Sequence, residues 1–500
     1  MSDENTKGDK KADDEKIFRA APTDEDQPGE RYFAQAEDEQ AAREGANAKA
    51  VVAVARTTER YRDLETIHAL TKEAIDYLGG IEKFVRAGQS VLIKPNQTGY
   101  FLADEGMTTD PRVVAALIRL CFDAGASRVM VAEGSGVDST RIVMQATGMT
   151  PACQAAGAEI VYFDDCEYRE TDIPRGKAIQ RIALPVPLLD ADVIINVCKG
   201  KTHHMDPITG AIKNWVGCIA LGHGREQHHD AHCFAEYVDI MTVTKPALNI
   251  CDAIIIGEGD GPVANTPRWC GCVLASTDPV AMDVTICQLF TLDHKDHQFA
   301  AEGAERGLGT NKLEEISIVG ASLEEARIEV RRPRQGWDYF PFNVIVGKGV
   351  TYAGTLGHWK SIADQFLKDG TWANVIALRG VPTFLIGDAE DPDFEKHVEQ
   401  GPYFVIDDAA PARYREDARV HLVPGHPALH NMLPDILKGF GLTVPGNLYK
   451  RGQEFLRAGE SRLLYVPPAQ VAKEVAALTL AVAGAGALAF AALRYLRGRN

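Results

Sequence analysis

Six of the 14 histidines fall in one short stretch between His203 and His232. Aspartates and Cys233 belong to the same stretch, and imidazole, carboxylate and thiolate groups are ligands of borderline divalent metals. The spacing from His228 and His229 to His232 would place two imidazoles on one face of a helix. Neither a zinc-finger spacing nor an HExxH spacing occurs, so the alternative is a polar loop whose histidines are exposed or hydrogen-bonded.

Three lysines, Lys199, Lys201 and Lys213, belong to the same part of the chain and follow an apolar strand that we expect to end at Val197. Ligands of open parallel sheets bind just beyond the carboxyl ends of the strands. A group of ammonium ions there suits a carboxylate or a phosphate, and a lysine beside other cations can have its pKa lowered enough to act as a base. The alternative for each lysine alone is a solvated surface charge.

Other strand ends carry similar groups. Lys94 and Asn96 follow the second expected strand, and Glu133 ends another. Glu258 and Asp260 close a further strand and could coordinate a cation, although Asp-Gly and Gly-Pro pairs are also typical of tight turns. Because the carboxyl ends of parallel strands share one edge of a sheet, we expect these side chains to meet.

These residue types predict an enzyme that acts on a small anionic substrate. The reaction would be proton transfer next to a carboxylate, as in isomerisation or racemisation, or metal-assisted hydrolysis or ligation. We assign catalysis to His203, Lys213 and Lys201, substrate binding to Lys94, Asn96, Asn214 and Glu133, a divalent metal of unspecified identity to His203, His204, Glu258 and Asp260, and a second metal candidate to His228, His229, His232 and Cys233. Two alternatives stay open: a membrane-tethered metal-binding or maturation protein without turnover, and an iron–sulfur electron-transfer partner.

The elements that must position these groups begin at residue 49, where short apolar runs start to alternate with amphipathic segments. Helices are expected at 66–78 and at 111–124, where Asp110 is a suitable N-cap and Pro111 a suitable first residue. Strands are expected at 51–54, 90–93, 128–132, 159–163, 192–197, 253–256, 272–275 and 316–319. Continuous apolar strands separated by helices predict a mostly parallel, doubly wound sheet, and so an α/β domain over residues 49–325.

Other regions flank this domain. Residues 1–48 are acidic and almost without apolar side chains, which predicts a disordered tail. After an arginine-rich connector, residues 326–465 have strands of their own, expected at 342–346 and 383–386, and predict a smaller α/β subdomain.

The clearest hydrophobic segment is a helix expected over residues 470–496. The 19 residues from Val475 to Leu493 carry no charge, and a helix of this length can cross a hydrocarbon core of about 30 Å. We expect a membrane anchor; the alternatives are a buried alanine-rich helix or a helix that pairs copies of the chain into a homo-oligomer. The arginines that follow the helix favour an orientation with the C-terminus in the cytoplasm. The missing N-terminal signal favours the opposite orientation, with the large domain in the cytoplasm, and we expect the latter.

Composition narrows the range of partners. Lys and Arg number 53 against 70 Asp and Glu, a net charge of −17, which disfavours nucleic acid as a partner. The hydrophobic fraction of 45% and the charged fraction of 25% are typical of a globular protein. The 10 cysteines are too few for a disulfide scaffold and are expected to be reduced. No CxxCxxC run occurs, so no ferredoxin-type cluster is expected.

The order of several short motifs resembles the family catalogued as domain of unknown function 362, over about residues 50–320. The motifs are Ile93-Lys94-Pro95-Asn96, Thr109-Asp110-Pro111, Lys199-x-Lys201-Thr202-His203, Thr209-Gly210-Ala211-x-Lys213-Asn214, Gly259-Asp260-Gly261-Pro262 and Asp278-Pro279-Val280-Ala281-x-Asp283. Many members of that family carry ferredoxin-type clusters, a pattern from which this chain departs. The segment from His203 to Lys213 is also similar to a His…Gly…Lys segment of nickel-pincer lactate racemases, in which the histidine and lysine serve the cofactor and proton or hydride transfer.

Overall fold

The computed structural model describes residues 49–60, 63–136, 139–219, 235–351, 354–423 and 429–441. Three of the sequence predictions lie outside the described residues: the acidic tail 1–48, the helix 470–496, and the second metal candidate at His228, His229, His232 and Cys233.

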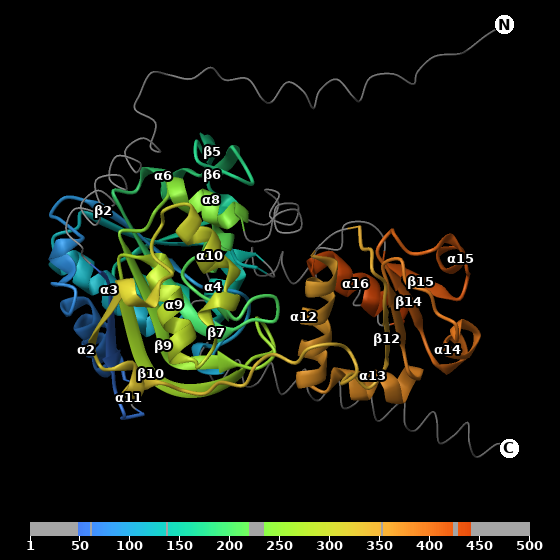
Figure 1. Ribbon diagram of the computed structural model, residues 1–500. Helices are drawn as coiled ribbons and strands as arrows, with labels where there is room; N and C mark the ends of the chain where they lie inside the picture. Colours follow the sequence, from blue (N-terminus) through green and yellow to red (C-terminus); the bar gives the residue numbers. More distant parts are fainter. Residues whose placement is uncertain are drawn as a thin grey trace, which may run out of the picture. The chain divides into compact units, whose positions relative to one another are not determined.

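The largest element is a nine-stranded sheet with the order β11-β1-β10-β9-β7-β2-β3-β4, in which β8 also pairs with β7 (Figure 1). Its strands are β1 (Ala50–Arg56), β2 (Ser90–Pro95), β3 (Arg128–Glu133), β4 (Glu159–Tyr162), β7 (Val193–Thr202), β8 (Ile208–Thr209), β9 (Leu248–Glu258), β10 (Thr266–Ser276) and β11 (Ile316–Gly320). The pairs from β9 through β7, β2 and β3 to β4 are parallel, as is β1 with β11. The predicted mostly parallel α/β fold is therefore confirmed.

One strand reverses this direction. β10 is antiparallel to both β1 and β9, because the loop 259–265 between β9 and β10 is too short for the crossover that parallel neighbours need.

The end of β7 differs from the sequence prediction. The strand continues to Thr202, whereas the apolar pattern ends at Val197, and its added residues pair with β9 as far as Lys201. Lys199 and Lys201 therefore lie within a buried strand and not in a loop after it. The pattern missed this because buried lysines are rare and need a partner that the local sequence does not show.

Helices cover both faces of the large sheet, as in a doubly wound fold (Figure 1). On β2, Val91 and Ile93 pack into the core formed with α2 and α3, and Leu92 packs into the core formed with α8 and α10. This alternation is what a strand buried on both faces requires. The helices are α2 (Leu64–Asp76), α3 (Pro111–Asp123), α4 (Thr140–Ala146), α5 (Met149–Ala155), α6 (Val186–Asp190), α8 (Ala235–Val243), α9 (Pro279–Leu289), α10 (Gln298–Glu305) and α11 (Leu323–Ala326).

Two of these helices begin with a capping aspartate, of which Asp110 is the predicted one. The Asp110 carboxylate accepts from the backbone N–H of Arg112 at the start of α3, and Asp278 accepts from the N–H of Ala281 at the start of α9. Each cap is followed by a proline as first helical residue. α3 therefore starts at a fixed position beside the carboxyl ends of the parallel strands, and α9 starts at a fixed position beside the opposite edge, where the antiparallel β10 ends.

Smaller elements complete the chain. Short 3-10 helices near the site are η2 (Ala103–Glu105), η4 (Lys213–Cys218) and η5 (His294–Asp296), and β5 (Tyr168–Asp172) pairs with β6 (Arg181–Pro185). A four-stranded parallel sheet consists of β12 (Asn343–Val346), β13 (Thr383–Ile386), β14 (Tyr403–Ile406) and β15 (Val420–Val423). The helices of this region are α12 (Thr355–Lys368), α13 (Thr371–Arg379), α14 (Phe394–Gln400), α15 (Ala412–Arg415) and α16 (Leu429–Gly439).

Candidate functional site

The carboxyl ends of β2 and β3 hold a buried ion pair. Lys94 Nζ donates to Glu133 Oε2 at 2.5 Å, and both side chains are almost fully enclosed. Gly217 of η4 lies against the pair, because a Cβ atom there would come within 2.7 Å of Lys94 Nζ and 2.5 Å of Glu133 Oε1. Only a residue without a side chain fits at this position. Two residues that the sequence assigns to substrate binding are thus brought together and neutralise each other.

Asparagine side chains connect η4 to three strands. Asn96 Nδ2 donates to Asn214 Oδ1 at 3.1 Å, and Asn214 Nδ2 donates to Asn196 Oδ1 at 2.8 Å. Asn196 of β7 in turn donates to Asn249 Oδ1 of β9 at 2.9 Å. Asn96 and Asn214, predicted to contact substrate, are therefore bonded to each other in the interior, where they hold η4 against the strand ends.

A second buried ion pair joins β7 to β9. Lys199 Nζ donates to Asp252 Oδ2 at 2.8 Å, and both side chains are buried. The same Asp252 oxygen accepts from the backbone N–H of Asp110, also at 2.8 Å. This pair explains how Lys199 can lie inside a strand, since the charge of each partner is balanced by the other.

Lys201 is fully buried at the end of β7. Its Nζ donates to Thr98 Oγ1 and to the Met107 carbonyl, each at 2.8 Å. Burial, followed by the positive charges of Lys213 and Lys199, lowers the pKa of Lys201 well below its usual value. The direction is the one expected for a base, but these contacts mean that Lys201 chiefly ties β7 to the loop between β2 and α3.

Lys213 begins η4 and is only 6% exposed. Its Nζ lies 5.6 Å from the centre of the Phe299 ring. Within the part of the chain that the structure describes, no carboxylate pairs with this ammonium group. A cation held over an aromatic ring in this way retains the capacity to attract an anion.

Asp283 of α9 holds the turn that precedes η4. Its Oδ1 accepts from the N–H of Ala211 at 2.5 Å, and its Oδ2 accepts from the N–H of Ile212 at 3.2 Å. A Cβ atom at Gly210 would lie 2.1 Å from Asp283 Oδ1. The Thr-Gly-Ala turn therefore contacts Asp283, although the two motifs are far apart in the sequence. Sequence analysis identified both motifs but did not predict that they touch.

His297 links two carboxylates that belong to different segments. Its Nδ1 bonds to Asp206, and its Nε2 lies 3.4 Å from Asp283 Oδ2. Burial alone would lower the pKa of His297, but the charges and hydrogen bonds of Asp206 and Asp283 outweigh burial and raise it to about 9. A buried imidazolium therefore holds the loop after β7 to α9. No sequence pattern pointed to His297, because its partners are about 90 and 14 residues away.

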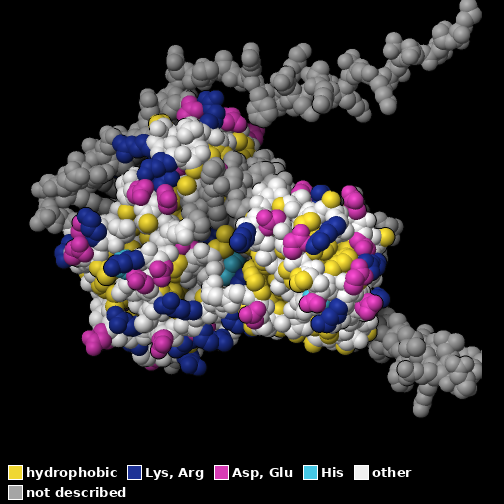
Figure 2. Space-filling model, turned by 45° about the vertical axis from the view of Figure 1, so that its right-hand side comes forward, with side chains coloured by type: hydrophobic (Ala, Val, Ile, Leu, Met, Phe, Trp, Pro, Cys, Tyr) yellow, Lys and Arg dark blue, Asp and Glu magenta, His cyan; other side chains and the backbone are white. Residues whose placement is uncertain are grey.

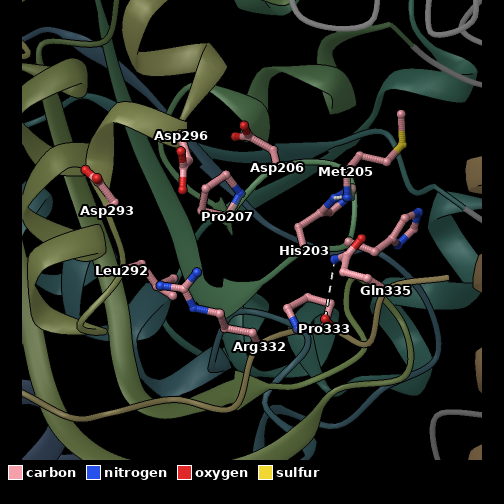
Figure 3. Close-up of a pocket in the computed structure, with 11 residues that line it drawn as sticks. His203, Met205, Asp206, Pro207, Leu292, Asp293, Asp296, Arg332, Pro333 and Gln335 are labelled. Atoms are coloured by element: carbon pink, nitrogen blue, oxygen red, sulfur yellow. Dashed lines mark hydrogen bonds between the residues drawn. The ribbon is translucent and has the colours of Figure 1, made fainter.

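A pocket of about 250 Å³ opens beside this clamp (Figure 3). His203 and Asp206 form one side, and Asp293 and Asp296 form another (Figure 3). The complete lining consists of His203, His204, Met205, Asp206, Pro207, Leu292, Asp293, Asp296, Arg332, Pro333 and Gln335. Sequence analysis identified His203 by its residue type. Asp293, Asp296 and Arg332 belong to segments in which it recognised no motif.

The ring of His203 has a defined tautomer. Its side chain is buried, and its Nδ1 accepts from the backbone N–H of Met205 at 3.1 Å. A ring nitrogen that accepts a hydrogen bond carries no proton, so the neutral ring carries its proton on Nε2. In this neutral form His203 is a hydrogen-bond donor through Nε2 and not a base at that atom.

Arg332 supplies the cation of this pocket. Its guanidinium projects toward the side that carries Leu292, Asp293 and Asp296 (Figure 3). Across the described ranges, no carboxylate lies within ion-pair distance of it. An exposed guanidinium that is free to bond is well suited to bidentate recognition of a carboxylate or phosphate.

The residues predicted to hold a metal have other partners. Glu258 accepts from Arg268 and Arg331, and Asp260 accepts from Arg334 through both carboxylate oxygens. His204 Nδ1 lies 2.6 Å from the Gly261 carbonyl, and burial lowers the pKa of His204 to about 4.

The structure does not bring these side chains together as a metal site. Among the described residues, no group of three or more His, Cys, Asp or Glu side chains is placed to hold a metal ion. Asp260 also lines a different pocket from His203.

The membrane prediction can be compared only with the described part of the chain. No helix there is long and apolar enough to span a bilayer.

Comparisons with known proteins agree with the motif order. A thylakoid-associated protein of Synechocystis sp. is 34% identical over 231 residues, which cover 45% of this chain and 70% of that protein. The lactate racemase apoprotein from Thermoanaerobacterium thermosaccharolyticum superposes with a TM-score of 0.32 at 10% identity, over 80% of this chain and 91% of that one. The family described as "Domain of unknown function (DUF362)" matches residues 91–288, which include the carboxyl ends of β2, β3, β7 and β9 but not the pocket residues Asp293, Asp296 and Arg332. The chain belongs to this family.

Proposed function

We propose that this chain is an enzyme that binds a small carboxylate substrate in the His203 pocket and moves a proton at the neighbouring carbon. The observation that carries the proposal is that one pocket holds a buried imidazole together with a guanidinium that has no carboxylate within ion-pair distance among the described residues. Its volume of about 250 Å³ lies below the roughly 300–1,000 Å³ of pockets for drug-sized ligands, so it suits a metabolite of a few carbon atoms.

Arg332 is the residue that would bind the substrate carboxylate. A guanidinium presents parallel N–H groups that match the two oxygens of a carboxylate, which fixes orientation as well as adding attraction. Lys213 does not line this pocket, but its charge is one of those that, after burial, lower the pKa of His204 on the pocket wall, so it adds a further cation near the pocket.

His203 would act on the developing charge. When a proton leaves the carbon next to a carboxylate or carbonyl, the electron pair of the C–H bond moves onto oxygen. A donor already aimed at that oxygen stabilises the charge without reorganisation. The Met205 N–H keeps His203 in the form that donates through Nε2.

A pocket carboxylate would take the proton. Asp293 and Asp296 lie across the pocket from Arg332 (Figure 3), and an ionised carboxylate can accept the proton and return it to either face of the carbon. No electrons are gained or lost overall, so the step needs no oxidant or reductant.

His297 is the positioning residue of this arrangement. It directly follows Asp296 and bonds to Asp206 across the pocket wall. The proposal takes no step through a metal, because the oxygens of Glu258 and Asp260 are bound by arginines.

The test is exchange of substrate hydrogen with solvent. Short-chain 2-hydroxy acids are incubated with the protein in D2O, and proton NMR follows loss of the signal of the hydrogen on the carbon next to the carboxylate. We expect exchange with at least one acid, and a loss of roughly a hundredfold or more in His203→Ala, as for removal of an oxyanion donor.

Two variants separate the donor role from a base. Glutamine has an N–H donor but cannot accept a proton, so His203→Gln should retain more activity than His203→Ala. Lys312→Gln, at an exposed surface position, is the matched control and should be unaffected. Absence of exchange with every acid, or equal rates in His203→Ala and the unaltered protein, would refute the proposal.

We further propose that the protein is membrane-associated, with its large domain on the cytoplasmic side. The support is the thylakoid-associated relative, together with the hydrophobic segment 475–493. Deletion of all residues after Pro468 should move the protein from the membrane to the soluble fraction of a cell lysate. Full-length protein that stays soluble without detergent would contradict this proposal and leave the enzymatic one untouched.

A further inference from the structure

A second pocket, of about 500 Å³, adjoins the arginine-rich connector. Its lining includes Arg331, Arg332, Arg334 and Lys368, with Asp260 as the only acidic member. The chain as a whole carries a net charge of −17, so this concentration of cations is local. Lys and Arg side chains also gather along the lower edge of the face in Figure 2, which shows that the surface charge is unevenly distributed.

Two of these cations are balanced by carboxylates. Arg334 donates to Asp260 through Nε at 2.9 Å and through Nη2 at 2.6 Å. Arg331 donates through Nε to Glu258 at 2.9 Å. These bonds hold the two guanidinium groups in place and cancel much of their charge.

The other two cations are not balanced. Lys368, the last residue of α12, donates to the carbonyl of Asn265 at 2.7 Å. In the described part of the chain, neither Lys368 nor Arg332 has a carboxylate within ion-pair distance. The lining therefore carries an excess of two positive charges, of which the Arg332 guanidinium projects toward the His203 pocket (Figure 3). Arg332 also lines the His203 pocket, so the two pockets share one wall.

We propose that this second pocket binds the phosphate group of a small phosphomonoester. A phosphate ester carries a charge of about −1.5 to −2 near pH 7 and three acceptor oxygens, which match two unbalanced cations and the remaining N–H groups of two fixed arginines. The volume lies within the range of small-molecule pockets and accommodates a ligand of nucleotide size. This site goes beyond the proton-transfer function. The two ligands would share Arg332, whereas Lys368 is a cation that lines this pocket and not the His203 pocket.

Calorimetric titration with glycerol phosphate and AMP tests the site, with glycerol and adenosine as matched ligands that lack the phosphate. We expect at least one phosphate ester to bind, and its dissociation constant to rise with ionic strength, because the attraction is between charges near the surface. Neither ligand without phosphate should bind.

Two variants connect binding to the pocket. Arg332→Gln and Lys368→Gln should each weaken binding by roughly tenfold or more, as expected for loss of a charge-assisted hydrogen bond. Lys312→Gln, which removes an exposed cation elsewhere, should bind as the unaltered protein does. Circular dichroism of each variant shows that the fold is retained.

Lys368→Gln also separates this inference from the proposed enzyme. Lys368 does not line the His203 pocket, so this variant should lose phosphate binding and keep deuterium exchange. The inference is overturned if neither phosphate ester binds, or if binding is the same in Arg332→Gln, Lys368→Gln and the unaltered protein.

Discussion

The clamp formed by His297 with Asp206 and Asp283 makes stability depend on pH in a defined direction. The pKa of His297 is raised from 6.5 to about 9, so the folded chain holds this proton more tightly than the unfolded one. The stabilisation is therefore complete below about pH 6.5 and is lost as the pH rises through about 9. At about 1.4 kcal/mol per pKa unit, the full effect is about 3 kcal/mol.

Urea unfolding followed by tryptophan fluorescence measures this effect, because Trp215 is buried in the same domain. The variant is His297→Gln combined with Asp206→Asn, which removes the imidazolium and the carboxylate bonded to its Nδ1 without leaving that charge unpaired. The unaltered protein should lose about 3 kcal/mol more than this variant between roughly pH 6 and pH 10.

His294→Gln is the control for this experiment. His294 is in the same loop, but its ring bonds to Gln288 and not to the two clamp carboxylates. This variant should show the same fall in stability as the unaltered protein. Equal pH dependence in the unaltered protein and the double variant would refute the reasoning, because the titrating group would then be somewhere else.

Two further predictions concern the interior of the site. Gly210→Ala places a Cβ atom 2.1 Å from Asp283 Oδ1, and such overpacking costs roughly 1–3 kcal/mol of stability. This variant should therefore have a lower melting temperature and slower deuterium exchange. Unchanged values for both would contradict the tight turn. Lys199→Met should lower the free energy of unfolding by about 3–5 kcal/mol, because it leaves Asp252 charged and buried, and the further change Asp252→Asn should recover much of the loss in urea unfolding. Lys312→Met, which removes one member of an exposed pair, should cost less than about 1 kcal/mol, and an equal cost at both positions would contradict the argument.

Much of the sheet could be predicted because local patterns determine it. Apolar runs such as 90–93 and 128–132 mark strands that are buried on both faces, and Asp110-Pro111 and Asp278-Pro279 mark helix starts through their own backbone contacts. Motif order pointed to the segment of His203, but not to the segments of Asp293, Asp296 and Arg332, which also line the pocket.

The chemistry of individual side chains could not be predicted in the same way. Whether Lys94 contacts substrate or a carboxylate depends on Glu133, which is 39 residues away. From the sequence alone Lys199 is assigned to a loop, because its buried partner, Asp252 of β9, is not apparent there. Lys213 has no carboxylate partner among the described residues, although its sequence context resembles those of Lys94 and Lys199. The deciding contacts are long-range, and residue type alone does not contain them.

The position of His297 explains why the clamp concerns function as well as stability. Asp296, the residue before His297, lines the pocket. Asp206, the hydrogen-bond partner of His297 in the loop after β7, also lines it. One imidazolium therefore joins the two walls that carry the proposed donor and the proposed bases. Loss of its charge would remove the attraction that holds those walls at a fixed separation. A pocket in which His203 and Asp296 act on neighbouring atoms of one small substrate requires that separation to be constant.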